Sequence, residues 1–393
     1  MNILHTVEFY SPSVGGAQEV VKQISERLVK RGHNVTVATS KLRNRTQSTI
    51  NGVNIVEFDV SGNFSRSYSG EIDRYKDFIL NSEFDVMMNY AAQQWATDLV
   101  LPLLNKISAK KVFVPCGYSG LFLSEYHEYF ENMKTWLKQY DKCIYLSKNY
   151  RDINFAKENG ITNDVWIPNG AGEDEFNAMS TFDIKSFLRI PPNHFLIIHV
   201  GSHTGAKGHK EAIEIFKKAK IPHSTLLIIA NNFGGGCTNS CHRSEKFYRW
   251  NPYARILDKN IIIKSLSREE TVAAYQSADL FLFPSNIECS PIVLFECMAS
   301  RTPFLTTDVG NAREIISWSQ SGILLPTIKD SKGYSHADIM QSKKSLEEIY
   351  HNPAKLSAMQ DTGFHSWQKR FSWEKIACQY EELYSKLMTT EVQ

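Results

Sequence analysis

The sequence lacks a long hydrophobic run, because no apolar stretch in its 393 residues reaches the roughly 20 residues that a membrane-spanning helix needs. Its N-terminal segment, MNILHTVEFYSPSVGG, also lacks the basic and then apolar pattern of a secretory signal. We therefore expect a cytoplasmic protein.

An imbalance of charge is also missing. Lys and Arg total 44 against 42 Asp and Glu, so the formal net charge is only +2. Nucleic-acid-binding proteins usually carry a basic excess, so we expect no nucleic-acid partner. The seven cysteines are scattered and odd in number, which indicates reduced thiols rather than a disulfide framework.

The sequence does contain short β-branched runs that alternate with helical patterns. These runs are continuously apolar, which predicts parallel sheets covered on both faces. The segment 17–32, with Val20, Val21, Ile24 and Leu28 on one side, is typical of the connecting helices. The order runs twice and predicts an α/β protein with two Rossmann-like, doubly wound domains. The predicted strands include residues 34–40, 53–58, 84–90, 111–115, 142–147, 195–201, 225–230, 260–265 and 279–285.

The break between the two domains is predicted near residues 166–193, where proline, asparagine and glycine are concentrated. We assign residues 1–168 to an N-terminal domain and residues 190–371 to a C-terminal domain. An amphipathic helix predicted over residues 372–388 is expected to join the N-terminal domain.

Two turns that contain glycine are candidate anion sites. Gly15 and Gly16 stand between a strand and a helix, where backbone N–H groups can face an anion, although a plain tight turn is the alternative. Ser202 and Lys207 follow another strand in VGSHTGAKGH. A lysine at a helix start opposes the helix dipole, so its position is explained if it faces a phosphate. The alternative is a solvated loop lysine.

The stretch PSNIECSPIVLFECM contains two acids in different settings. Glu288 lies beyond the carboxyl end of a predicted strand, where ligands bind open α/β sheets. Ser290 is predicted to cap the following helix, with Pro291 at its first position. The N–H groups of Ile292 and Val293 would then point toward a phosphate.

The second acid, Glu296, lies among apolar residues in the second turn of that predicted helix. Side chains lean toward the N-terminus of a helix, so its carboxylate can approach the same crevice. An unpaired carboxylate in a core would cost roughly several kcal/mol, so Glu296 needs a ligand or a buried donor. The alternative to a ligand-binding acid is a buried ion pair.

The E-x₇-E pattern after FPS, followed by TPFLTTDVGNAREII, resembles the retaining glycosyltransferases of family four, which have the GT-B fold. The likeness covers nearly the whole chain, since PSVGGAQEVV, VWIPNGAGEDEF, VGSHTGAKGH and SWEKIACQYEELY resemble other family segments in the same order. It implies a hexosyltransferase of polysaccharide biosynthesis. A nucleoside diphosphate sugar, with UDP favoured, would be the donor, and a glycan, lipid-linked or small molecule would be the acceptor.

The same resemblance implies roles for individual residues. Glu288 would contact the transferred sugar, Glu296 would hold the ribose hydroxyls, and Lys207 would neutralise the diphosphate. Glu288 and Lys207 are thus the expected catalytic residues, and neither a metal ion nor a cofactor is expected. The expected donor-binding residues are Gly15, Gly16, Ser202, Lys207, Glu288, Ser290, Ile292, Val293 and Glu296.

Two departures from the family pattern affect the site. Ser202 and His203 stand where the family usually has arginine, and His203, His209 and Arg243 are the candidate replacements. Cys116 stands where the family tends to have a histidine, and a thiol cannot supply the same ring contact to a sugar. These departures favour one alternative, a non-catalytic nucleotide-sugar-binding protein. A nucleotide-sugar epimerase is a further alternative, since the fold also hosts epimerases.

Two further segments contain candidate functional side chains. Cys237, Cys241 and His242 offer metal ligands, but C-x₃-C-H is not the usual spacing and a fourth ligand is not evident. We expect residues 233–250 to form a glycine-rich loop over the donor instead. The aromatic stretch 117–140 is an ordinary amphipathic helix, a platform for a carbohydrate acceptor, or a peripheral contact with the inner face of a membrane. The sequence does not indicate an oligomeric state.

Overall fold

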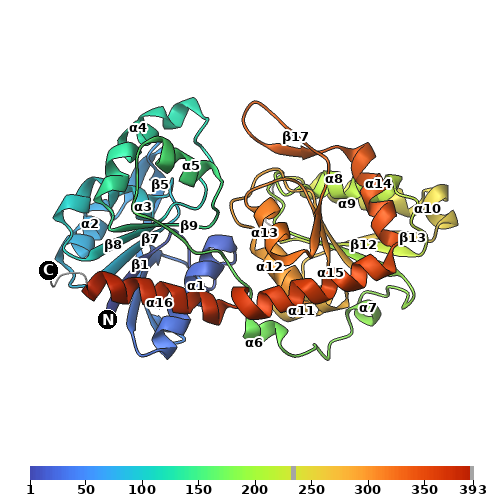
Figure 1. Ribbon diagram of the computed structural model, residues 1–393, viewed down its shortest axis with the longest axis horizontal. Coiled ribbons are helices and arrows are strands. Elements are labelled where there is room, and N and C mark those ends of the chain that lie inside the picture. The colour runs from blue at the N-terminus through green and yellow to red at the C-terminus, as the bar shows by residue number, and fades with distance from the viewer. Residues whose placement is uncertain (232–235, 390–393) are drawn as a thin grey trace. The chain divides into compact units, whose positions relative to one another are not determined.

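The computed structural model describes residues 1–231 and 236–389, which form two compact units (Figure 1). The N-terminal unit comprises Met1–Asn169 and the C-terminal helix from Trp373, and the C-terminal unit comprises Gly170–Ser372. Each unit is built on its own sheet of mainly parallel strands. Within the described ranges, no helix combines the length and the hydrophobicity needed to cross a membrane.

The N-terminal sheet has eight strands in the order β10-β9-β8-β7-β1-β2-β4-β3. Among the described residues of this sheet, β3 and β4 form the antiparallel pair, and the other strand pairs are parallel. The order reverses between β1 and β7, the topological switch point at which such sheets bind ligands. The strands are β1 Asn2–Thr6, β2 Asn34–Ser40, β3 Thr49–Ile50, β4 Val53–Phe58, β7 Val86–Tyr90, β8 Lys110–Val114, β9 Lys142–Tyr145 and β10 Asp164–Trp166, with a separate hairpin of β5 Val60–Asn63 and β6 Ser67–Gly70.

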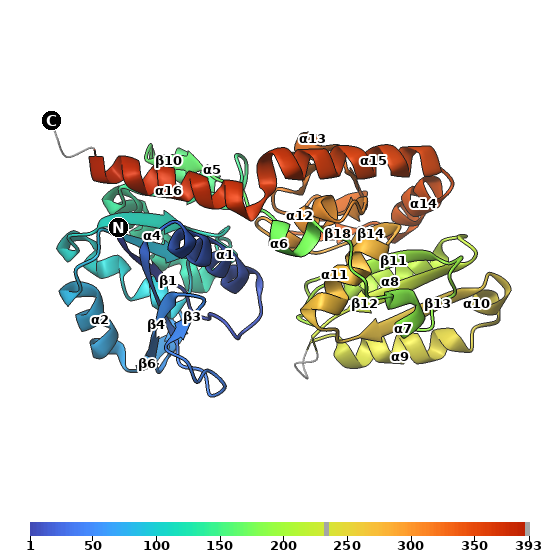
Figure 2. The same ribbon diagram turned by 90° about the horizontal axis from the view of Figure 1, so that it is seen from below.

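The last helix of the chain packs in the N-terminal unit, where it lies beside the first helix (Figure 2). Arg31, just after that first helix, contacts Glu381 at 2.8 Å and Glu374 at 2.5 Å. The hydroxyl of Tyr384 meets Nε2 of His5 at 3.2 Å in the core. The helices of this unit are α1 Gly16–Lys30, α2 Ile72–Asn81, α3 Trp95–Asp98, α4 His127–Trp136, α5 Arg151–Glu158 and α16 Trp373–Thr389.

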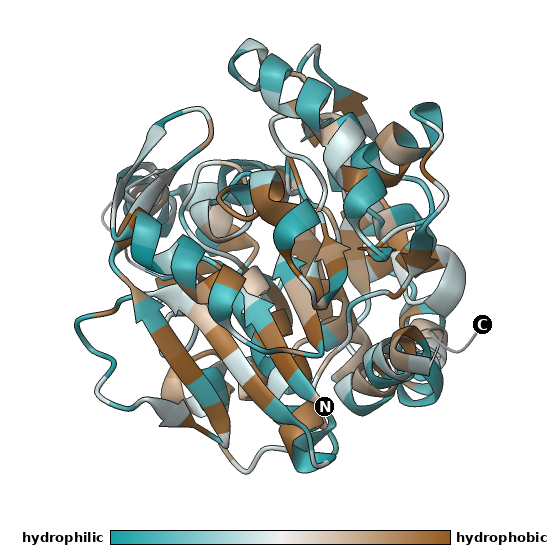
Figure 3. Ribbon diagram, turned by 90° about the vertical axis from the view of Figure 1, so that its left-hand side faces the viewer, coloured by the Kyte–Doolittle hydropathy of each residue, from teal (hydrophilic) through white to brown (hydrophobic). Residues whose placement is uncertain are grey.

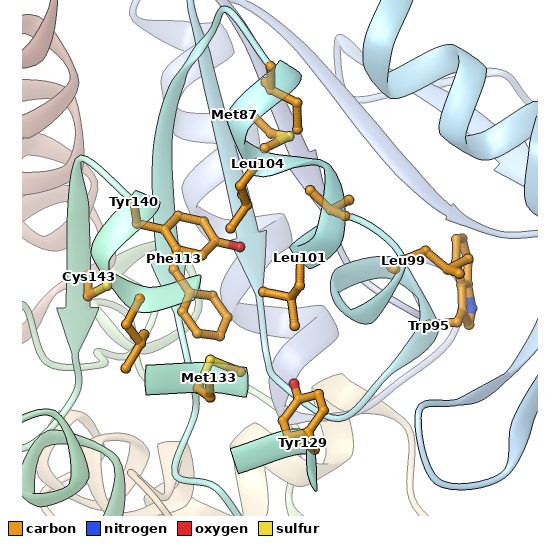
Figure 4. Close-up of a cluster of buried hydrophobic side chains, with 14 of the residues drawn as sticks. Met87, Trp95, Leu99, Leu101, Leu104, Phe113, Tyr129, Met133, Tyr140 and Cys143 are labelled. Atoms are coloured by element: carbon orange, nitrogen blue, oxygen red, sulfur yellow. The ribbon is translucent and has the colours of Figure 1, made fainter. Parts of the chain in front are cut away.

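The core of the N-terminal unit is rich in aromatic side chains (Figure 4). The rings of Phe113 and Tyr140 stack at 4.9 Å, and the Tyr140 hydroxyl donates to Asn89 at 2.8 Å. Brown, hydrophobic bands run along the strands near the N-terminus in Figure 3. The stretch 117–140 packs into this core through the buried side chains of Tyr118, Tyr126, Tyr129, Phe130, Met133 and Leu137.

The C-terminal sheet has six parallel strands in the order β13-β12-β11-β14-β15-β16. Side chains that alternate along a strand pack into different hydrophobic cores. In the strand that begins at Phe195, Leu196 and Ile198 belong to one core and Ile197 belongs to the other. Both faces are therefore covered, as continuously apolar strands require. The strands are β11 Phe195–Val200, β12 Ser224–Ile229, β13 Lys259–Lys264, β14 Leu280–Phe283, β15 Phe304–Thr306 and β16 Gly322–Leu324, with a hairpin of β17 Thr327–Lys329 and β18 Ser335–Ala337.

The segment that we interpreted as a linker contributes to the C-terminal core through Phe176, Ile184 and Ile190. The chain passes between the units at Asn169 and Gly170, and again at Ser372 and Trp373. The helices of the C-terminal unit are α6 Glu173–Phe176, α7 Ile184–Phe187, α8 His209–Lys218, α9 Thr238–Arg249, α10 Pro252–Ile256, α11 Arg268–Ser277, α12 Ile292–Ala299, α13 Ala312–Ser319, α14 Ile339–Tyr350 and α15 Pro353–Ser366.

The predicted fold class is confirmed. Each predicted strand forms, with ends that differ from the prediction by at most two residues. The helix predicted over 17–32 forms as α1, and Gly32 adopts a φ of 89° beyond its end, which is suited to a residue without Cβ.

Candidate functional site

The switch point of the C-terminal sheet lies between β11 and β14. These strands pair directly, with Ile197 opposite Leu280, although they are distant in the sequence. The loops that leave their carboxyl ends, residues 201–208 and 284–291, therefore start side by side. Open α/β sheets bind ligands at this position.

The two loops are fitted to each other through their backbones. Gly208 has a φ of 75°, and a Cβ on it would lie 2.0 Å from the carbonyl oxygen of Pro284. The N–H of Asn286 donates to the carbonyl of Ala206 at 2.9 Å, and the Ser285 hydroxyl donates to the same oxygen at 3.2 Å. These contacts hold Lys207 against the second loop.

Lys207 and Glu288 form an ion pair between the two loops. Nζ of Lys207 lies 2.7 Å from Oε1 of Glu288, and the Ser285 hydroxyl donates to the same oxygen at 2.9 Å. The Lys207 side chain is 30% exposed and the Glu288 side chain is 11% exposed. The cation and the acid that the sequence assigned to phosphate and sugar thus meet at the sheet edge, and solvent still reaches the cation.

Glu296 has a protein partner that the sequence did not reveal. Its Oε1 lies 2.6 Å from Nη2 of Arg268. The same guanidinium group also binds Glu175, with Nε donating to Oε1 at 2.7 Å and Nη2 donating to Oε2 at 2.6 Å. The Glu296 side chain is 6% exposed, whereas that of Arg268 is 44% exposed. Burial, and then the charge of Glu296, raises the pKa of Tyr275 well above its usual value, so this hydroxyl stays neutral. Removal of Glu296 would therefore leave Arg268 without one of its partners.

The helix after Glu288 begins one residue later than predicted. Pro291 is the N-cap and Ile292 is the first residue of α12, so Ser290 is not the cap. Its hydroxyl instead accepts from Nδ2 of Asn311 at 3.0 Å, which fixes the loop from the neighbouring connection. Ile292 and Val293 still lie in the first turn, where backbone N–H groups have no acceptor within the helix.

The candidate replacements for the missing arginine do not include a charged histidine. Burial, and then the neighbouring His199, lowers the pKa of His209 to about 2. Burial also lowers the pKa of His203, with a smaller effect from His242. Both rings are therefore neutral near pH 7 and add no positive charge beside Ser202 and Lys207.

Sequence reasoning missed Arg268. The signal was present, because Arg268 is the first residue of α11, where a cation opposes the helix dipole. The same reasoning had singled out Lys207. Arg268 and Glu175 come from α11 and α6, so only the folded unit brings them to Glu296.

Gly15 and Gly16 lie in the N-terminal unit, as the N-cap and the first residue of α1. Lys207, Glu288 and Glu296 lie in the C-terminal unit. The structure thus groups the last three on one unit, and the glycines contribute a separate helix start to the other unit.

The carboxyl ends of β7 and β8 in the N-terminal unit carry several left-handed residues that are not glycine. Ala91, Gln93, Cys116 and Tyr118 have φ values of 67°, 63°, 59° and 48°. Oε1 of Gln93 accepts from the N–H of Gly120 at 3.1 Å and links the two loops. Such backbone strain concentrates at ligand sites, so these loops are the candidate site of the N-terminal unit.

The cysteine motif does not form the loop that we expected over residues 233–250. Thr238–Arg249 is helix α9, with Cys237 as its N-cap, while residues 233–235 lie outside the described residues. His242 interacts with Glu245 at 3.2 Å. It is His203, from the loop after β11, that meets Cys237, with Nδ1 and Sγ 3.3 Å apart.

Comparison with known proteins finds similarity to glycosyltransferases. Residues 180–360 match the family model described as "Glycosyl transferases group 1". An uncharacterized glycosyltransferase from Methanocaldococcus jannaschii is 24% identical over 98% of this chain and 97% of that protein. The N-acetyl-alpha-D-glucosaminyl L-malate synthase of Bacillus anthracis is 22% identical over 95% of this chain and 94% of that protein.

Two solved structures resemble the whole chain. The sucrose-phosphate synthase of Thermosynechococcus elongatus superposes with a TM-score of 0.80 at 18% identity, covering 99% of this chain and 100% of that one. Anabaena HepE in complex with UDP-glucose superposes with a TM-score of 0.73 at 16% identity, covering 98% of this chain and 100% of that one. At these identities the likeness establishes the fold, which is GT-B.

Proposed function

Since this chain is a glycosyltransferase with the GT-B fold, and its C-terminal unit matches the group 1 family model, we propose that it transfers a hexose from a UDP-sugar with retention of configuration. The observation that carries the proposal is the Lys207–Glu288 pair at the switch point of the C-terminal sheet. The structure of Anabaena HepE, which resembles this chain in fold, contains UDP-glucose and so supports a UDP-sugar as the donor.

Lys207 is proposed to serve the diphosphate. When the donor binds, its phosphate oxygens compete with Glu288 for the ammonium group, which is partly exposed and can turn toward them. The N–H groups of Ile292 and Val293 at the start of α12 add fixed dipoles aimed at the same negative charge. Ser202, in the loop that carries Lys207, is proposed to contact the same phosphates.

The proposed transfer step retains the configuration of the anomeric carbon. The acceptor oxygen forms a bond to the anomeric carbon on the face from which the diphosphate leaves, and the bond from that carbon to the phosphate oxygen breaks. The acceptor proton passes to the departing phosphate, so no separate protein base is required. Lys207 and the start of α12 stabilise the charge that develops on the leaving group, which is where electrostatic catalysis is most effective.

Glu288 is proposed to bind the hydroxyls of the transferred sugar, and Glu296 those of the ribose. A carboxylate offers two oxygens with about four acceptor positions, so Glu296 can bind Arg268 through Oε1 and still accept from a diol. Arg268 then acts as a positioning residue that holds the carboxylate charged and fixed.

The acceptor is proposed to bind the N-terminal unit, at the strained loops after β7 and β8. Cys116 and Tyr118 keep a costly backbone conformation there, and the carboxyl end of the sheet is the usual ligand side. Within the stretch 117–140, Phe122 is 58% exposed, whereas most of its other aromatic side chains are buried. This composition supports a small contact with an acceptor, while peripheral membrane attachment stays a prediction.

The test is incubation of the purified full-length chain with a panel of nucleotide sugars and candidate acceptors. Release of UDP together with a new α-linked product by NMR supports the proposal. Conversion of the sugar without release of UDP indicates an epimerase, and binding without turnover indicates a non-catalytic protein. Glu288→Gln tests the site. Glu269→Gln is the matched control, because it makes the same substitution at an exposed position on α11.

A further inference from the structure

Three side chains with soft or borderline ligand atoms converge inside the C-terminal unit. Nδ1 of His203 and the Sγ atoms of Cys237 and Cys241 all lie within 4.8 Å of one another. The three residues are 7%, 6% and 1% exposed, so the cluster is buried. It is separate from the Lys207–Glu288 pair, although His203 and Lys207 belong to the same loop.

The backbone brings these residues together by a close contact. Cys237 is the N-cap of α9, and Cys241 follows one turn later on the same helix face. Gly236, just before Cys237, has a φ of 60°, and a Cβ on it would lie 1.8 Å from the carbonyl oxygen of His203. Glycine therefore allows the start of α9 to lie directly on the loop that carries His203.

The ring of His203 is also oriented for ligation. His209 stacks on it, with ring centroids 4.6 Å apart and planes at 28°. Nδ1 of His203 faces Sγ of Cys237 at 3.3 Å. The stacking limits rotation of the ring and so keeps Nδ1 directed toward this sulfur.

The spacing suits a tetrahedral ion. Zn²⁺ binds thiolate sulfur at about 2.3 Å and imidazole nitrogen at about 2.0–2.1 Å, so neighbouring ligand atoms in a tetrahedron lie about 3.4–3.8 Å apart. The distance of 3.3 Å between Nδ1 of His203 and Sγ of Cys237 is close to this range. The other ligand atoms are at most 4.8 Å apart, so they would need to approach one another by about 1 Å or less to bind a common ion.

We propose that His203, Cys237 and Cys241 bind one Zn²⁺ ion, with water in the fourth position. Two sulfurs and one imidazole, completed by water, form a ligand set that zinc uses in proteins. His242 is not a ligand in this site, because it interacts with Glu245 and its side chain is 40% exposed. The ion would fasten the loop of Lys207 to the start of α9.

The proposal is independent of the proposed function, so its test measures metal rather than activity. The full-length chain is purified under a phosphine reductant, stripped with a chelator, and titrated with Zn²⁺ against a chromophoric chelator. We expect one ion per chain. Cys237→Ser and Cys241→Ser should each lower the affinity by more than about a hundredfold, since even outer-shell substitutions cost 10–100-fold.

Two matched variants test specificity. Cys378→Ser removes a partly exposed thiol from α16, and His223→Ala disrupts the other histidine-containing cluster, His194, His223 and Asp258. Both should bind zinc as the natural sequence does. Three results would each overturn the proposal: zinc binding by Cys237→Ser and Cys241→Ser as tight as that of the natural sequence, loss of binding in His223→Ala, or no binding by the reduced natural sequence.

Substitution of Co²⁺ decides the matter even if a cysteine variant does not fold. Bound to the natural sequence, cobalt should show thiolate-to-metal charge-transfer absorption together with the intense visible bands of tetrahedral coordination. Weak octahedral bands without charge transfer would show that the cysteines do not bind the ion, and would contradict the site.

Discussion

The Lys207–Glu288 and Arg268–Glu296 pairs both belong to the C-terminal unit, but their surroundings differ. Lys207 and Glu288 come from two loops at the carboxyl ends of β11 and β14, and one hydroxyl, that of Ser285, supports the acid. Arg268 and Glu296 come from two helices, and Glu175 holds the guanidinium through both of its oxygens. The first pair has a lysine, whose ammonium group is carried by a flexible four-carbon chain, and the second has an arginine, whose donors form a rigid planar fork.

This difference indicates different uses for two acids in one motif. A loop pair with a flexible ammonium exchanges partners at little cost, because pairs in contact with solvent contribute only about 0–1 kcal/mol. A carboxylate that is 6% exposed and already paired is held in position before any ligand binds. We therefore expect Glu288 to determine turnover, and Glu296 to determine nucleotide affinity and stability.

Glu288→Gln should have the largest effect, and on turnover alone. We expect kcat to fall by at least about a hundredfold, near 2.7 kcal/mol, because a charged acceptor is lost where the sugar changes charge. The free energy of unfolding should change by less than about 1 kcal/mol. Initial rates of UDP release measure the effect, with Glu269→Gln as control, and a kcat within about threefold of the natural sequence would remove Glu288 from the chemistry.

Glu296→Ala should have the largest effect on stability. Arg268 would lose a nearly buried partner, and we expect the free energy of unfolding to fall by roughly 2–3 kcal/mol. The loss is smaller than for a fully buried pair, because Arg268 is 44% exposed and keeps its bonds to Glu175. Urea unfolding followed by circular dichroism measures the change, and Glu288→Ala is the comparison. Similar losses in the two variants would show that the pairs are equivalent.

Lys207→Ala should weaken UDP binding about tenfold at low salt, or about 1.4 kcal/mol, because one cation is removed from the diphosphate. The difference should shrink as salt is added. Lys207→Arg, which keeps the charge, should retain most of the affinity. If calorimetry at low salt finds the alanine variant unchanged, another cation serves the diphosphate.

Arg268→Lys should have the smallest effect. The charge is kept, but the fork that binds Glu175 and Glu296 together is lost, so we expect a destabilisation of roughly 0.5–1 kcal/mol. The same urea experiment measures it. A loss as large as that of Glu296→Ala would mean that geometry, rather than charge, holds Glu296 in place.

The sequence predicted those features that depend on local pattern. Continuously apolar runs such as 195–201 and 225–230 identified buried parallel strands, because the burial of both faces leaves no room for alternation. The place of Glu288 beyond a strand end followed from the same periodicity. Lys207 was found because its position opposes the local helix dipole.

Features that depend on packing between distant segments could not be predicted. Asn311 holds the hydroxyl of Ser290 and displaces the predicted cap, although the local sequence favours Ser290. His203 meets Cys237 only because a glycine brings two loops together, whereas sequence spacing pointed to His242. The left-handed backbone of Cys116 likewise has no local signal, since only its surroundings impose it.

The most direct test of the division between the two acids is titration calorimetry of UDP into Glu288→Gln and Glu296→Gln. These substitutions are equal in chemistry, and circular dichroism checks that both variants fold. We predict that Glu288→Gln binds UDP within about threefold of the natural sequence, while Glu296→Gln binds it roughly ten- to a hundredfold more weakly. Equal losses in the two variants, or a loss confined to Glu288→Gln, would contradict the assignment of Glu288 to the sugar and Glu296 to the nucleotide.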